Sequence, residues 1–466
     1  MQQIKLEEVR ELVEHGHFEQ LRTLLTEMDP ADVADLVEAI DDSEEQDRVF
    51  SMLEPVMVSD VVAEMDAGPL DELAEHKTPE ELADILTNMA PDDAADVIEE
   101  LELPTEELRE ILRLVPEEER SAISELLRYE EDSGGSIMTP ELCALPSDTS
   151  VIDALKAIGE ANLSDPIMQV YVVETKTGVL LGYVNIVELL SHSETASDSG
   201  HTFSTRLTLG DLVKTNYIWA TTDDDQEKIA RDFRKYNLWV MPVVDAKHRL
   251  VGRITADDIM DVIQEEADED MAKMIGAPDF EEHEESAFKA VRMRLPWLLI
   301  TMVAGLLNSL LIDNIQAATQ IATVSIFVPV LMAMGGNTSI QATAIAVREI
   351  AVGRLGPSHL GQTIWKQILI GAMMGIVAAS VVWVGAYAVL EFFVQPEGVI
   401  VSRLCWAIAT AMFTGMVFAS VFGSIVPVIL DKLHIDPAVA SGPFVTTSND
   451  LSASLIYFGT CVLLIM

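Results

Sequence analysis

The fold class of this chain is decided by its last stretch, Phe444-Val-Thr-Thr-Ser-Asn-Asp-Leu-Ser-Ala-Ser-Leu-Ile-Tyr-Phe-Gly-Thr-Cys-Val-Leu-Leu-Ile-Met466. The stretch is mostly apolar and has the length that a helix needs to cross a bilayer, about 20 residues. Its only charged residue is Asp450. A charge inside a membrane span costs at least about 2.5 kcal/mol, so Asp450 should face a pore and mark an ion site.

The residues around Asp450 favour a hard divalent cation as the ion. Thr446 precedes Asp450 by one helical turn, so the Thr446 carbonyl and the Asp450 carboxylate can share a face. Carboxylate, carbonyl and water oxygens are the ligands that Mg²⁺ accepts. Zinc or copper would need His or Cys in ligand spacing, and the sequence has neither beside Asp450.

Four further apolar stretches precede this one, at about residues 296–312, 317–334, 368–394 and 401–430. The sequence therefore predicts five membrane spans. Basic residues gather before the first span and between the second and third, whereas the loops after the first and third spans hold mainly acids. This asymmetry predicts a multi-pass protein of the cell membrane with a cytosolic N-terminal half and an external C-terminus.

The end of the second predicted span carries Gly335-Gly-Asn-Thr-Ser-Ile-Gln341. Glycine pairs and asparagine are poor neighbours for lipid, and a backbone that loosens in a membrane survives only beside protein or a water-filled path. We therefore expect a loosened backbone that lines a pore, and the alternative is that the glycine pair serves close helix packing. The candidate pore-lining residues are Pro329, Gly335, Gly336, Asn337 and Gln341.

The charge of the chain is concentrated before the spans. The formal net charge is −48, yet from residue 292 onward seven basic and seven acidic residues balance each other. Such an excess of acids excludes nucleic acid as a partner, because phosphate binding needs clustered Lys and Arg. The 3 cysteines lie far apart, so neither a disulfide framework nor a zinc site is indicated.

The acidic half itself divides into recurring units. Residues 1–132 predict an all-α superhelical domain, because segments such as Pro79-Glu-Glu-Leu and Pro91-Asp-Asp-Ala recur every 12 or 13 residues from 79 to 116. Residues 133–200 and 201–264 each predict a helix followed by two strands, and this α+β order resembles a tandem pair of CBS domains. The predicted helices are 151–160 and 226–236, and the predicted strands are 168–173, 179–184, 239–244 and 250–254. An acidic connecting helix is predicted at 265–291, ahead of the membrane domain at 292–466.

The whole arrangement resembles the MgtE family of magnesium channels, through its domain order and through Gly335-Gly-Asn-Thr-Ser-Ile-Gln341 and Asp436-Pro-Ala…Asp450. The resemblance implies a homodimer with a pore on its two-fold axis, where Asp450 holds hydrated Mg²⁺ and Thr446 and Asp436 are further candidate ligands. Ser339 and Ile340 stand where the family pattern often has Gly and Asn. Selectivity among Mg²⁺, Mn²⁺ and Co²⁺ therefore stays open.

The resemblance also implies cytosolic Mg²⁺ sensors, which would draw the acidic domains together and close the pore. Several of these acids are three or four residues apart, which places them on one helical face. Thr255-Ala-Asp-Asp258 further resembles the ribose signature of CBS domains that bind ATP. The candidate sensor positions are Asp60, Asp92, Asp96, Gly135, Asp225, Glu227, Asp258, Asp261, Glu266, Glu269 and Asp270.

The sequence thus predicts a magnesium-gated magnesium channel of the cytoplasmic membrane. One alternative is a membrane-tethered sensor of adenine nucleotides, which would need no charge in the fifth span, and another is a transporter that prefers Mn²⁺ or Co²⁺. An enzyme is not expected, because the sequence carries no Ser-His-Asp, Walker or metal-hydrolase motif.

Overall fold

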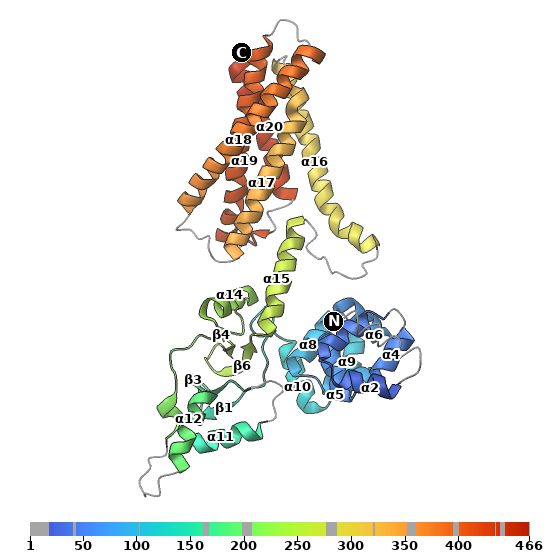
Figure 1. The fold of residues 1–466 in the computed structure, drawn as a ribbon, viewed down its shortest axis with the longest axis vertical. Coiled ribbons are helices and arrows are strands. Elements are labelled where there is room, and N and C mark those ends of the chain that lie inside the picture. Colours follow the sequence, from blue (N-terminus) through green and yellow to red (C-terminus); the bar gives the residue numbers. More distant parts are fainter. Residues whose placement is uncertain are drawn as a thin grey trace. The chain divides into compact units, whose positions relative to one another are not determined.

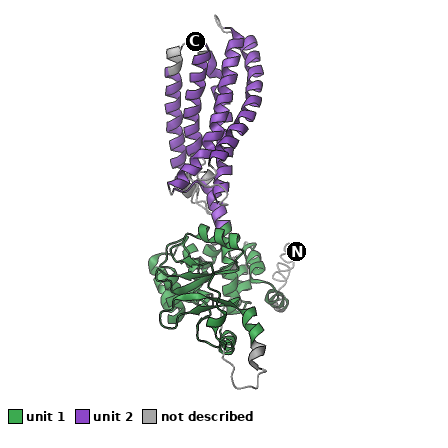
Figure 2. Cartoon of the chain, turned by 90° about the vertical axis from the view of Figure 1, so that its left-hand side faces the viewer, with its two compact units in different colours: residues 1–263 green, residues 264–466 purple. Residues whose placement is uncertain are grey.

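The protein was analysed as a computed structural model. The chain divides into two compact units, residues 1–263 and residues 264–466 (Figure 2). The predicted connecting helix is described in part, since residues 276–286 lie outside the described residues. The structure describes residues 18–40, 43–101, 103–161, 167–197, 207–275, 287–319, 322–351, 360–394, 400–433, 435–438 and 443–465.

The first unit begins with a series of short helices (Figure 1). Proline opens α3, α5, α7 and α8, where its missing N–H costs no hydrogen bond. The repeat differs at Pro104 and Pro116, which precede their helices as cap residues. The helices are α2 (Phe18–Thr26), α3 (Pro30–Glu38), α4 (Ser43–Phe50), α5 (Pro55–Ala63), α6 (Ala67–His76), α7 (Pro79–Thr87), α8 (Pro91–Glu100), α9 (Thr105–Leu114) and α10 (Glu117–Leu126).

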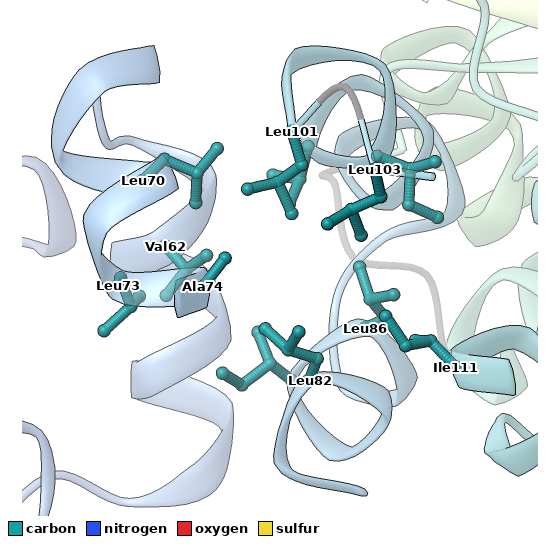
Figure 3. Close-up of a pocket in the computed structure, with 12 residues that line it drawn as sticks. Val62, Leu70, Leu73, Ala74, Leu82, Leu86, Leu101, Leu103 and Ile111 are labelled. Carbon is teal, nitrogen blue, oxygen red and sulfur yellow. The ribbon is translucent and has the colours of Figure 1, made fainter. Parts of the chain in front are cut away.

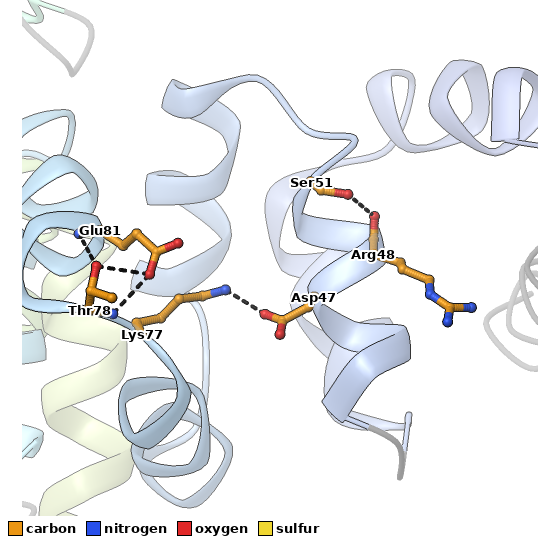
Figure 4. A network of polar contacts seen from close by, with 6 residues as sticks. All are labelled: Asp47, Arg48, Ser51, Lys77, Thr78 and Glu81. Atoms are coloured by element: carbon orange, nitrogen blue, oxygen red, sulfur yellow. Dashed lines mark hydrogen bonds and ion pairs between the residues drawn. The ribbon is translucent and has the colours of Figure 1, made fainter.

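Local polar contacts and a shared apolar interior hold these helices together. Thr78 and Glu81 form a reciprocal cap at the start of α7, and Lys77 pairs with Asp47 of α4 at 2.5 Å (Figure 4). Figure 3 shows apolar side chains from α5, α6, α7 and α9, including Leu70 and Leu82, converging on the interior of the domain. Burial of this apolar surface is the main stabilising contribution.

Two three-stranded sheets follow in the described part of the chain, and they share one topology. In each sheet the first and second strands are parallel and the second and third are antiparallel. A register shift interrupts the antiparallel pair at the same place in both, Val172/Val173 and Val243/Val244. The elements are β1 (Ala144–Pro146), α11 (Val151–Glu160), β2 (Gln169–Val173), β3 (Leu180–Asn185), α12 (Ile186–Ser197), α13 (Leu209–Leu212), β4 (Ala220–Thr221), α14 (Gln226–Tyr236), β5 (Val240–Val244) and β6 (Leu250–Thr255).

The helical domain packs on the second sheet within the first unit. Ala95 of α8 and Leu126 of α10 belong to the same apolar cluster as the core of that second sheet. At the junction the Gly135 N–H donates to the Thr222 carbonyl at 3.0 Å. A Cβ at Gly135 would overlap the ring of Tyr129, so the close approach requires glycine.

The helix α15 (Asp258–Ile275) leads into the second unit. Among the described residues of this unit, five helices are long and apolar enough to cross a membrane. These candidate spans are Leu295–Asn314, Thr323–Ala351, Gly361–Val394, Val401–Lys432 and Phe444–Ile465. The elements are α16 (Ala287–Thr319), the 3₁₀ segment η1 (Ala322–Phe327), α17 (Val328–Ala351), α18 (Leu360–Val389), the π-helical segment η2 (Leu390–Val394), α19 (Val401–Lys432) and α20 (Pro443–Ile465).

Two predictions for the second span are wrong. The predicted bounds, 317–334, are displaced, because residues 317–319 close α16 and the span covers Thr323–Ala351. The predicted loosening of the backbone is also absent, since α17 runs unbroken through Gly335 and Gly336. Polar residues in its second half pack against neighbouring helices, and the Thr343 hydroxyl donates to the Gly423 carbonyl of α19 at 2.8 Å. The predicted span ended too early because it stopped where the uninterrupted apolar run stops, at the polar residues that follow Gly336.

Candidate ion pathway and cation-sensing acids

Asp450 lies on the packed face of α20. Leu451 and Leu455 form the exposed stripe of this helix and are 43% and 51% exposed. Ser454 and Tyr457, one and two turns after Asp450, are buried, and Asp450 itself is half-buried on their side of the helix. The carboxylate is thus directed away from the stripe that a lipid would cover.

Within the described part of α20, several buried polar groups close to Asp450 in the sequence have no hydrogen-bond partner. Asn449 is completely buried, yet neither its amide oxygen nor its amide nitrogen has a hydrogen-bond partner among the residues that the structure describes. The Thr447 and Ser454 hydroxyls likewise have no hydrogen-bond partner within the described part of the chain. A buried polar group without a partner costs about 1–3 kcal/mol. A purely structural helix contact would avoid this cost, so the composition of the face favours contact with water or ions.

The glycine pair of α17 packs against this part of α20. A Cβ at Gly335 would lie 3.2 Å from the Asn449 amide nitrogen, and one at Gly336 would lie 3.9 Å from a Thr446 methyl group. Both glycines are buried, whereas three other predicted lining residues lie on the uncovered face of α17. These exposed residues are Pro329, Asn337 and Gln341.

Asp436 lies in the short segment between α19 and α20. Its carboxylate accepts a hydrogen bond from the Ala438 N–H at 2.7 Å and lies 2.8 Å from the Lys273 ammonium. Lys273 also pairs with Glu269, one turn earlier on α15. Two predicted metal-binding residues of the second unit therefore share one lysine as their partner.

One group of acids in the first unit involves α8 and the start of α15. Burial, together with the charges of Asp93 and Asp258, raises the pKa of Asp92 to about 8. Burial and the charges of Asp92 and Asp93 raise the pKa of Asp96 to about 8 as well, although Asp96 keeps an exposed surface. Like charges held together in this way are relieved by a proton or a cation.

A second group of acids includes a residue that the sequence did not single out. Burial raises the pKa of Glu64, and the charges of Asp261, Asp29 and Asp60 add to the effect. The pKa of Asp60 and that of Asp261 are raised by burial too. Glu64 follows Asp60 by one helical turn, and this spacing could have identified it.

The other predicted positions have mainly local roles. Asp225 caps the start of α14 by accepting from the Lys228 N–H at 3.2 Å. Glu227 lies 3.9 Å from Arg231. The Thr255 N–H donates to Asp258 at 3.0 Å, which closes the turn before α15.

These contacts do not by themselves assemble a metal centre. Within the part of the chain that the structure describes, no group of three or more His, Cys, Asp or Glu side chains could hold a metal ion. The assignment of individual residues to Mg²⁺ or ATP therefore stays a prediction, including that of Glu266 and Asp270 on α15.

The fold defines a multi-span membrane protein with an acidic soluble half that contains paired CBS-type sheets. The model of the divalent cation transporter family MgtE matches residues 328–460, that of the MgtE intracellular N domain matches 28–132, and that of the CBS domain matches 135–194 and 209–265. A magnesium transporter MgtE of Enterococcus faecalis is 32% identical over 343 residues, 73% of this chain and 71% of that protein. The chain belongs to the MgtE family of transporters.

Solved structures resemble the soluble half. The soluble part of a magnesium transporter aligns with a TM-score of 0.50 and 24% identity, over 57% of this chain and 100% of that chain. The cytosolic domain of the Mg²⁺ channel MgtE in complex with ATP aligns with a TM-score of 0.48 and 28% identity, over 55% and 99%. The first of these likenesses agrees with the described fold of the acidic half.

Proposed function

We propose that this chain forms a Mg²⁺ channel of the cytoplasmic membrane, with a pore lined by α17 and α20. The observation that carries the proposal is the position of Asp450, a half-buried acid on the packed face of a membrane span. An ionisable residue held there at a cost of a few kcal/mol is expected to serve ion passage. Family membership adds that the relatives are named as magnesium transporters.

A homodimer would complete the pathway. One carboxylate per chain provides few ligands for a hydrated dication. A two-fold axis beside α17 and α20 would bring the Asp450 carboxylates of two chains to one site. Asn337 and Gln341 lie on the face of α17 that is uncovered in the single chain, and their amide groups can hydrogen-bond the water shell of the ion. In this arrangement the acidic half is cytosolic and the C-terminus is outside.

The experiment compares Asp450→Asn with Asp431→Asn, which removes a carboxylate from the exposed end of α19. In proteoliposomes Asp450→Asn should abolish Mg²⁺ flux, whereas Asp431→Asn should conduct as the wild type does. Flux measured in turn with Mg²⁺, Mn²⁺ and Co²⁺ determines which ion is preferred. Wild-type flux through Asp450→Asn would remove this carboxylate from the pore.

Cytosolic Mg²⁺ would close this channel by bridging the acids of the first unit. The pKa values of Asp92 and Asp96 are raised to about 8 each, so burial and neighbouring acids disfavour their charged forms. A bound dication would neutralise the two carboxylates in place of protons. Binding that favours the closed arrangement shifts the population toward it. Removal of residues 1–132 should leave a channel that still conducts when Mg²⁺ is high on the cytosolic side, and unchanged closure would assign sensing to another part of the chain.

The turn of Thr255 and Asp258 is a candidate site for the ribose of ATP. The Thr255 hydroxyl lies 2.8 Å from the Asp258 carboxylate, so the hydroxyl and the acid of the signature are adjacent. Asp258 also contributes to the repulsion at Asp92. ATP and Mg²⁺ would then influence each other through one side chain, and equilibrium binding of labelled ATP to wild type and Asp258→Asn tests this.

A further inference from the structure

Lys273 lies in the last turn of α15 and contacts carboxylates of two different elements. Its ammonium lies 2.8 Å from Asp436 in the segment before α20 and also pairs with Glu269 on its own helix. The side chain is 18% exposed, close to the 15% of Lys77 in its pair with Asp47 and below the 43% of Lys214 and the 52% of Lys228. All three groups of the Lys273 contact belong to the second unit.

The contact connects two elements that are far apart in the sequence. Asp436 is itself fixed, because its other carboxylate oxygen accepts the Ala438 N–H at 2.7 Å and so shapes the turn that leads into α20. Asp450 follows on α20, fourteen residues after Asp436. The lysine therefore holds the end of the connecting helix to the segment that precedes the span with the half-buried Asp450.

The chemistry of the contact is that of a cation between two carboxylates. Burial disfavours the charged form of Lys273, but its hydrogen bonds and ion pairs with Asp436 and Glu269 outweigh this and raise the pKa of the ammonium. The lysine thus stays charged over the physiological range of pH. A divalent ion could bridge the same two carboxylates only after displacing it.

We propose that Lys273 is a built-in counter-ion that ties α15 to the α19–α20 segment and supports the closed channel without a metal ion at this place. The proposal rests on the proposed function, and it reassigns Glu269 and Asp436 from metal ligands to partners of a lysine. Mg²⁺ bound elsewhere then completes a closure that Lys273 already favours. The channel would close at a lower cytosolic Mg²⁺ concentration than metal bridges alone would allow.

The experiment is made on the full chain in proteoliposomes, with Mg²⁺ varied on the side of the acidic half. Lys273→Met keeps most of the aliphatic stem and removes the charge. A partly exposed pair of this kind changes an equilibrium by roughly 1.5-fold to fivefold, so the Mg²⁺ concentration at half-closure should rise by that factor. Lys432→Met, at the exposed end of α19, is the matched control and should close as the wild type does.

Lys273→Arg distinguishes the ion pair from a general loss of packing. It keeps the positive charge, so it should reach half-closure near the wild-type Mg²⁺ concentration, whereas Lys273→Met should not. An unchanged concentration of half-closure in Lys273→Met overturns the proposal while leaving the channel itself in place. The absence of Mg²⁺ flux through the wild-type chain would overturn the proposed function instead.

A second measurement does not depend on transport. Hydrogen exchange of the full chain without Mg²⁺ should show the last turn of α15 and residues 435–438 exchanging roughly 1.5-fold to fivefold faster in Lys273→Met. Equal exchange in wild type and variant would mean that the pair does not hold these segments together, and the proposal fails.

Discussion

The replacement Asp92→Asn tests most directly whether the acids of the first unit are held together against their own repulsion. The pKa of Asp92 rises from 3.8 to about 8, chiefly through burial. A displacement by one pKa unit corresponds to about 1.4 kcal/mol. Because Asp92 is only half-buried, solvent screens much of the effect, and we take about 1.4 kcal/mol as the gain from removing the charge above pH 8. The amide oxygen can still accept the hydrogen bond from Thr139.

The assay is thermal unfolding of the soluble half, from the N-terminus to the end of α15, with and without Mg²⁺. For a domain of this size 1.4 kcal/mol raises Tm by about 3 to 6 °C, so the metal-free variant should be more stable than the wild type. Adding Mg²⁺ should raise the Tm of the variant less than that of the wild type. The loss of one binding site, at a Mg²⁺ concentration a hundred times its Kd, removes about 2.7 kcal/mol of stabilisation. Asp84→Asn, on the exposed side of α7, is the control. A lower Tm in both conditions would refute the reasoning and show that the Asp92 carboxylate is structural.

Three further outcomes follow from other contacts. Asp92 and Asp96 keep their protons up to pH about 8 in the folded state, whereas they release them near pH 3.8 in the unfolded state. The metal-free soluble half should therefore lose stability as pH rises from about 4 to 8. Unfolding curves at several pH values should show a smaller loss when Mg²⁺ is present. A Cβ at Gly423 would overlap the Ser339 carbonyl oxygen, so Gly423→Val should destabilise the membrane half by about 1–3 kcal/mol, seen as a lower Tm in detergent, while Gly459→Val, in open space, should not. Thr78→Ala removes the cap of α7 and should cost the helical domain about 1 kcal/mol in denaturant unfolding.

The order of elements in the CBS-type sheets could be predicted closely because strand and helix periodicities differ and the pattern occurs twice. The helices α11 and α14 have the predicted bounds, and each of the four longer strands agrees to within a residue at either end. The short strands β1 and β4 were not predicted. They contain three and two residues, and what makes them strands is pairing with β2 and β5, which no local pattern reveals.

The acids posed a different problem, because a sequence gives their spacing on one helix but not their neighbours on another. Asp92 and Asp96 are four residues apart, and their shared face was predictable. The approach of Asp258 to Asp92 depends on the packing of the helical domain against the second sheet, through residues such as Ala95. Lys273 shows the opposite case. Its helix is acidic, so nothing in the sequence indicated that a single lysine would be the partner of Asp436.

The pore residues of α17 show why a membrane helix is harder to orient than a soluble one. In water an apolar face must be buried, but in a bilayer both lipid and protein accept apolar side chains, so apolar pattern alone does not choose a face. Glycine and small polar residues at 335–339 favoured both a pore and a close contact. The structure separates the two roles on one helix: Gly335 and Gly336 pack on α20, whereas Asn337 and Gln341 remain uncovered. Polar amides left uncovered on a membrane span need water or a second chain, and the proposed two-fold pore supplies both.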